Sequence, residues 1–190
     1  MGSLNYKEYF DKAVSYEKYK ENFQTEIASG EQHEFSEYLP HNWSRSSRLD
    51  KKFNLSEELK TVVSTLKQPL YWMVITEHWC GDASQINPII TKVAESSKGM
   101  IKLKYIYRDE NPDLINAHLT DGKSRSIPIL IQMDENFKLL NTYGPRPAEA
   151  QKLVMEILAK GENYIMPVHT WYARDKQKSI QADLVEFLTN

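Results

Sequence analysis

Residues 70–83 read LYWMVITEHWCGDA, an apolar run that leads into the only cysteine of the chain, Cys80. Seven nearly continuous apolar residues, at 70–76, are typical of a central strand that helices cover on both faces. A helix-like apolar pattern begins directly after Cys80. The sequence therefore predicts a strand, a tight turn that carries Cys80, and a helix.

The turn predicts a reactive thiol. A cysteine at the start of a helix lies near unpaired backbone N–H groups and the positive end of the helix dipole, which favour the thiolate. Asp82 acts in the opposite direction, because a nearby carboxylate raises the pKa of a thiol. Asp82 also has two readings, as a cap that complements the dipole or as a base beside Cys80. The sequence leaves both questions open.

Further strands and helices follow along the chain. The pattern predicts a helix that contains Pro88, a second strand at 101–107, a third that begins at 127–131, and a fourth at 137–143 paired with the third in a hairpin. A strand–helix–strand order favours a parallel pair joined by a right-handed crossover. We therefore expect an α/β fold with a helix-covered mixed sheet of four strands.

The flanking segments are expected to be helical extensions. The pattern of residues 5–28 predicts an amphipathic helix that is broken in two. Residues 29–53 are expected to form a connecting loop with a basic stretch, and residues 171–188 are expected to form one further helix. Another helix is expected to begin at Asn54, with Glu57 completing a capping box. The expected domain organisation is an N-terminal helical extension at 1–55, a central domain at 56–162, and a C-terminal helix of the same domain at 163–190.

Composition excludes several classes of protein. The net charge of −2 gives no electrostatic reason to expect a nucleic-acid or anionic-membrane partner. No signal-peptide core and no apolar run of about 18–20 residues is present, so we expect a cytoplasmic protein. One cysteine excludes an intramolecular disulfide, and the five histidines show no zinc-type spacing, so no metal is expected.

Two motifs carry a family resemblance. Trp79, Cys80 and Gly81 after the first strand, with Ile127 and Pro128 opening the third, resemble the thioredoxin fold over residues 60–160. The resemblance implies that Pro128 has a cis peptide bond and faces the cysteine turn. The family reads Trp-Cys-Gly-Pro-Cys at the turn, so the positions of Asp82 and Ala83 depart from its pattern.

Four short motifs narrow the resemblance. WCGDA at 79–83, RDEN at 108–111, SIP at 126–128 and GPRP at 144–147 look like a bacterial group of thioredoxin-like proteins. Such a group implies a thioredoxin-like fold with N-terminal and C-terminal helical extensions and a role in cell redox homeostasis.

The expected function is monothiol redox chemistry. Because Ala83 replaces the second thiol, a mixed disulfide at Cys80 needs an external thiol such as glutathione or bacillithiol to resolve it. The expected substrates are mixed disulfides of proteins or of low-molecular-weight thiols, with no bound cofactor. The expected catalytic residues are Cys80 and Asp82, and the expected substrate-binding residues are Trp79, Gly81, Ile127, Pro128 and Arg125.

Other readings remain beside this one. The chain is alternatively a non-catalytic module that binds a peptide or protein in the groove lined by Trp79 and Ile127. Arg125 has an alternative reading as an ordinary loop charge. Trp171 and Tyr172 are either a dimer contact or core residues, and the oligomeric state stays open.

Overall fold

A computed structural model describes residues 4–189. Within this range the strands form one mixed sheet in the order β2-β1-β3-β4. β1 and β2 are parallel, whereas β3 is antiparallel to both β1 and β4. The predicted four-stranded mixed sheet with a C-terminal hairpin is therefore confirmed. The strand bounds are β1 (Leu70–Thr76), β2 (Ile101–Tyr107), β3 (Ile129–Met133) and β4 (Leu139–Tyr143).

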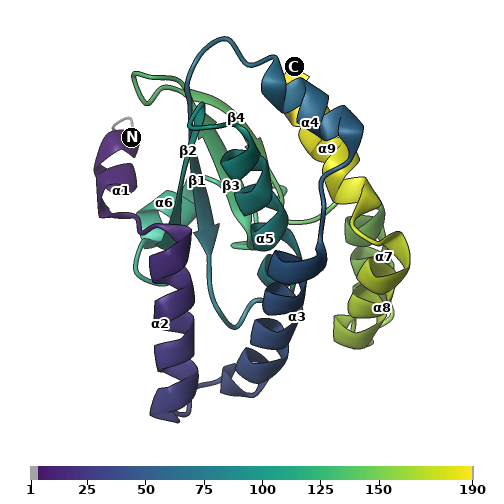
Figure 1. Cartoon of the computed structure of the whole chain (residues 1–190). Helices are drawn as coiled ribbons and strands as arrows, with labels where there is room; N and C mark the ends of the chain where they lie inside the picture. The colour runs from purple at the N-terminus through teal and green to yellow at the C-terminus, as the bar shows by residue number, and fades with distance from the viewer. Residues whose placement is uncertain (1–3, 190) are drawn as a thin grey trace.

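Helices cover both faces of the sheet (Figure 1). α4 (Glu57–Ser64), α5 (Gly81–Ser96) and α9 (Lys178–Thr189) pack on the face that presents Trp72 and Val74. α1 (Tyr6–Lys12) and α6 (Pro112–Asn116) cover the opposite face, where Met73 and Ile75 are buried. Successive β1 residues thus enter two different apolar clusters, which is why this strand reads as a continuous apolar run.

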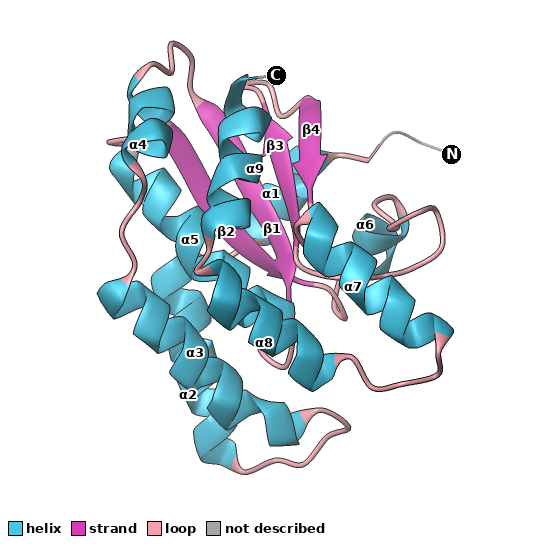
Figure 2. Cartoon of the chain, turned by 90° about the vertical axis from the view of Figure 1, so that its right-hand side faces the viewer, coloured by secondary structure: helices cyan, strands magenta, loops and turns pink. Residues whose placement is uncertain are grey.

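A second group of helices gathers at the end of the sheet where β1 leads into α5 (Figure 2). The helices of this group belong to segments that flank the sheet in the sequence. They place side chains around the turn that carries Cys80. These helices are α2 (Tyr16–Ser29), α3 (Leu39–Lys52) and α8 (Ile165–Asp175), with the single-turn 3₁₀-helix η1 (Ser36–Tyr38) before α3 and α7 (Ala148–Ala159) before α8.

The segment between α1 and α2 closes one edge of the sheet. The backbone N–H of Val14 donates to the carbonyl of Tyr105 at 2.9 Å, and the N–H of Tyr105 donates back at 2.8 Å. This isolated antiparallel bridge covers part of the outer edge of β2. The N-terminal helices are therefore attached to the sheet through backbone hydrogen bonds, which satisfy groups that an open edge would expose.

The prediction of a loop over 29–53 is wrong, because α3 occupies residues 39–52. Leu39 and Leu49 are the buried apolar side chains of this helix, Trp43 packs on the core while partly buried, and Asn42 and Ser46 are buried beside them. A buried face that is half polar leaves no continuous apolar stripe in the sequence. Pro40 lies in the first turn of the helix, where a missing N–H breaks no helical hydrogen bond.

Other helix boundaries also differ from the predictions. The N-cap of α4 is Ser56, whose hydroxyl accepts the N–H of Leu59 at 3.2 Å, so Asn54 does not cap this helix. The single helix expected over 171–188 is wrong as well. Lys176 and Gln177 adopt left-handed backbone conformations, with φ of 53° and 62°, and separate α8 from α9. The predicted break of the first helix is confirmed by α1 and α2.

We expect Leu184→Ala to lower the free energy of unfolding by about 2–5 kcal/mol, since Leu184 is fully buried where α9 packs on the core. Leu140→Ala is the matched control, because Leu140 on β4 is 50% exposed, and its effect should stay within about 0.5 kcal/mol. Urea denaturation measures both. Equal effects would contradict the packing of α9.

Candidate functional site

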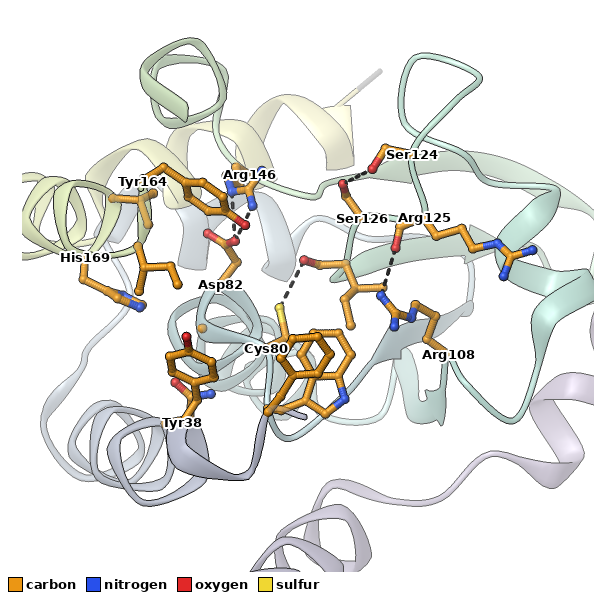
Figure 3. A pocket seen from close by; sticks show the side chains of 17 residues that line it. Tyr38, Cys80, Asp82, Arg108, Ser124, Arg125, Ser126, Arg146, Tyr164 and His169 are labelled. Atoms are coloured by element: carbon orange, nitrogen blue, oxygen red, sulfur yellow. Dashed lines mark hydrogen bonds and ion pairs between the residues drawn. The ribbon is translucent and has the colours of Figure 1, made fainter. Parts of the chain in front are cut away.

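Cys80 lies between the end of β1 and the start of α5, at the N-cap of that helix. Its Sγ accepts the backbone N–H of Ala83 at 3.4 Å and donates to the carbonyl of Ile127 at 3.3 Å. The Ile127–Pro128 peptide bond is cis, as the resemblance implied. Figure 3 shows the thiol pointing toward the loop before β3. The predicted turn and the predicted proline therefore do face each other.

The thiol is buried, with only 7% of the residue exposed. Burial raises the pKa of Cys80 to about 12, and the carboxylate of Asp82 adds to this increase. The backbone N–H of Ala83 and the guanidinium of Arg146 lower this pKa by smaller amounts. Of the opposing effects that the sequence left open, burial and Asp82 outweigh the helix N-terminus, and the protein keeps Cys80 as a neutral thiol at neutral pH.

Asp82 is engaged on both carboxylate oxygens. Nε of Arg146 donates to Oδ2 at 2.8 Å, and its terminal nitrogen lies 2.7 Å from the same oxygen. The hydroxyl of Tyr172 donates to Oδ1 at 2.8 Å. Burial raises the pKa of Asp82, and the contacts with Arg146 and Tyr172 oppose that increase. Since both oxygens already accept hydrogen bonds from Arg146 and Tyr172, the arrangement makes Asp82 an anchor between segments rather than a free base.

A pocket of about 390 Å³ opens beside Cys80. Asp82 and Arg146 lie on one wall, and Arg108 and the loop before β3 lie on the other (Figure 3). Asn42, η1 and the residue before it, and α8 with its N-cap Tyr164 contribute the remaining walls. The lining residues are Phe35, Tyr38, Asn42, Trp79, Cys80, Gly81, Asp82, Arg108, Ser124, Arg125, Ser126, Ile127, Arg146, Tyr164, Ile165, Val168 and His169.

The predicted substrate-binding residues have different positions in this pocket. Trp79 packs against Phe35, with the ring centroids 4.6 Å apart. The guanidinium of Arg108 lies over the Trp79 ring, 4.6 Å from the ring centroid. The carbonyl oxygen of Ile127 accepts a hydrogen bond from the Cys80 thiol. Arg125 turns its side chain away from Cys80 (Figure 3), and its Nε donates to Asn116 at 2.8 Å. Only the backbone of Arg125 is thus directed toward the site.

Gly81 is the point where α8 approaches the cysteine turn most closely. A Cβ at this position would lie 2.8 Å from Nε2 of His169, a distance too short for two nonbonded heavy atoms. Any side chain larger than that of glycine would force the histidine ring to move. In the structure Gly81 has a packing role, which the sequence did not indicate, in addition to its predicted role in substrate binding.

Two neighbouring groups have structural roles. His78 is buried, stacks on Phe23 and contacts the carboxylate of Glu26 through Nδ1. Its other ring nitrogen lies 3.1 Å from the carbonyl of Tyr19, so the ring points into the core. Tyr172 is fully buried, which excludes it from the dimer contact considered for the C-terminal segment.

Sequence reasoning missed several pocket residues. Arg108 directly follows β2, and the parallel pairing of β1 with β2 brings the C-terminal ends of both strands together beside Cys80. The position of Arg108 after the second strand could therefore have indicated that it lies near the cysteine. His169 and Tyr164 come from a segment about 85 residues downstream of the turn. No local pattern in that segment indicates that it lies on the cysteine turn.

Within residues 4–189, no group of three or more His, Cys, Asp or Glu side chains is arranged to bind a metal ion. None of the helices in the same range combines the length and the apolar character needed to cross a membrane.

A cysteine at the N-cap of a helix, placed after a central strand and opposite a cis-proline, defines a thioredoxin-like protein. The thioredoxin family model matches residues 29–162, and the chain belongs to this family. Membership suggests a function of the redox type. No curated protein matches the chain.

Two crystal structures share the fold. One is the 1.5 Å structure of PA1234, a protein of unknown function from Pseudomonas aeruginosa, with a TM-score of 0.66 and 18% identity, covering 97% of this chain and 96% of that chain. The other is an HIV epitope-scaffold, with a TM-score of 0.65 and 16% identity, covering 96% of each chain. At these identities the similarity shows the fold alone.

We expect Gly81→Ala to lower the free energy of unfolding by about 1–3 kcal/mol, because the added methyl group overlaps His169. The double variant Gly81→Ala/His169→Ala should recover part of this loss, since the clashing ring is gone. Urea denaturation of both single variants and the double variant gives the coupling energy. Strictly additive losses would contradict the contact.

Proposed function

We propose that this thioredoxin-family protein binds a ligand in the pocket beside Cys80 and does not use the thiol as a nucleophile. The observation that carries the proposal is the burial of Cys80 next to Asp82, which raises the pKa of the thiol to about 12. The pocket supplies aromatic walls, backbone groups of the loop before β3, and charged side chains. These are the features of a recognition site.

The raised pKa has a kinetic consequence. At pH 7 a thiol with a pKa of about 12 is ionised to about one part in 10⁵, against about 3% for an ordinary cysteine. The higher intrinsic nucleophilicity of a more basic thiolate recovers only part of this difference. Exchange at Cys80 should therefore be about a hundredfold slower than at an exposed thiol. Such a thiol gives no advantage over free glutathione.

Monothiol redox chemistry is the second candidate, because the thiol lines the pocket and faces the cis peptide bond before Pro128. In this reaction the Cys80 thiolate attacks one sulfur of a mixed disulfide, the disulfide bond breaks, and the other sulfur leaves as a thiolate. Glutathione or bacillithiol then releases the protein in a second exchange. Each exchange is redox-neutral overall, and the external thiol replaces the missing thiol at Ala83.

The proposal includes a cellular setting. The lone cysteine favours a reducing compartment, and the motifs WCGDA, RDEN, SIP and GPRP resemble a bacterial group of thioredoxin-like proteins. We therefore place the protein in a bacterial cytoplasm, with no bound cofactor and no nucleic-acid or membrane partner. Its ligand in this proposal is a peptide or a low-molecular-weight thiol compound.

The alkylation rate of Cys80 tests the state of the thiol. We expect the rate with iodoacetamide to rise about tenfold per pH unit from pH 7 to pH 10 without a plateau, because only the thiolate reacts. The same chain unfolded in urea should level off above about pH 8.5. A plateau below pH 9 in the folded protein would show a reactive thiolate.

Oxidised glutathione separates the two candidates. We expect mass spectrometry to find no glutathione adduct on folded Cys80 after a time in which the urea-unfolded chain is fully modified. The binding function also requires that Cys80→Ser, which keeps the size of the side chain, retains the ligand affinity of the wild type. Rapid adduct formation on the folded protein would favour the monothiol reaction and overturn the binding proposal.

A further inference from the structure

Segments that flank the sheet in the sequence form part of the walls of the pocket beside Cys80. Phe35 and Tyr38 approach it from the side of α3, and Tyr164 and His169 approach it from the side of α8. A volume of about 390 Å³ lies within the range of about 300–1,000 Å³ that is usual for small-molecule sites. The walls thus favour a small molecule over the surface of a folded protein.

The charged groups of this pocket are mostly cationic. Arg108, Arg125 and Arg146 line it, and Asp82 is its carboxylate. Asp82 is already paired with Arg146, and the guanidinium of Arg125 is directed toward Asn116. Arg108 is therefore the cation best placed to meet a ligand.

Arg108 is held in position with donors to spare. Its Nε and one terminal nitrogen contact Asp109 at 2.8 and 2.7 Å, and its other terminal nitrogen donates to the carbonyl of Arg125 at 3.4 Å. A guanidinium has five N–H groups, so two of them have no partner among the described residues. The side chain of Asp109 is 57% exposed, which weakens its hold on the charge. Stacking on Trp79 fixes the plane of the guanidinium.

A second observation comes from the wall across from Arg108. Nδ1 of His169 is buried and has no hydrogen-bond partner. Burial lowers the pKa of His169 to about 4, and Arg45 adds to this decrease, so the ring is neutral at pH 7. A buried polar atom without a partner is costly, so this ring is a polar group that the fold itself leaves unsatisfied. Figure 3 shows the ring directed toward the cysteine turn.

We infer that the pocket binds a small organic carboxylate, with its carboxylate on Arg108 and its apolar body against Trp79 and Tyr164. This inference rests on the proposed binding function and names the chemical class of its ligand. The two unused N–H groups of Arg108 are suited to carboxylate oxygens, because guanidinium–carboxylate hydrogen bonds are charge-assisted. The aromatic side chains of the walls accept the carbon skeleton. His169 lines the same pocket and adds a neutral ring to its wall.

The test compares 4-phenylbutyrate with 4-phenylbutanamide, which have nearly the same shape and differ in charge. NMR titration of the ¹⁵N-labelled protein follows the amide of Gly81 and the indole N–H of Trp79. We expect the carboxylate to bind at least about tenfold more tightly than the amide, since a hydrogen bond to a charged group is worth more than one to a neutral group.

Arg108→Gln should remove this preference, leaving both compounds with the affinity of the amide. Arg174→Gln, on the exposed surface of α8, removes the same charge away from the pocket and should keep the preference. Equal affinity of the two compounds for the wild type, the absence of pocket shifts with the carboxylate, or an unchanged preference in Arg108→Gln would each overturn the inference. None of these results depends on Cys80, so the outcome is separate from the oxidised-glutathione experiment, which decides the proposed function.

Discussion

The buried ion pair between Asp82 and Arg146 is the interaction on which the site depends. Asp82 belongs to the first turn of α5, Arg146 to the loop after β4, and Tyr172, the third member, to α8. One carboxylate therefore joins the end of the sheet to two segments that follow it in the chain. This connection is a polar attachment of α8 to the cysteine turn, and it adds to the apolar packing of Val168 in the core.

A buried ion pair is a costly way to obtain stability. Desolvation of both charges cancels much of their attraction, whereas removal of one partner leaves an uncompensated charge in the core. What this pair supplies is geometry, because Arg146 and Tyr172 each donate to a different oxygen of Asp82. The same carboxylate raises the pKa of the Cys80 thiol. The interaction that shapes the pocket thus works against reactivity at its centre.

Local sequence patterns were sufficient for the sheet. The bounds of β1 and β2 were predicted to the residue, because β1 is a short apolar run, β2 alternates, and each ends at a clear turn. α3 was missed because its buried face is half polar, and the end of α8 was missed because left-handed residues at Lys176 and Gln177 carry no strong sequence signal. Cys80 and Pro128 were placed correctly by motif. The partners of Asp82 lie 64 and 90 residues away, and no local rule links positions at that distance.

The position of Cys80 at a helix N-terminus favours a thiolate, and the relative size of two effects explains why the structure keeps a neutral thiol. A helix dipole is worth about 0.3–1 kcal/mol, up to about 2 kcal/mol in partly buried sites, which corresponds to about one pKa unit. Full burial shifts a pKa by up to 3–5 units. Burial of Cys80 in the cluster with Ala83 and Ile127 therefore outweighs the helix N-terminus. The turn supplies the geometry of a reactive cysteine, but the environment that three-dimensional packing creates decides its protonation.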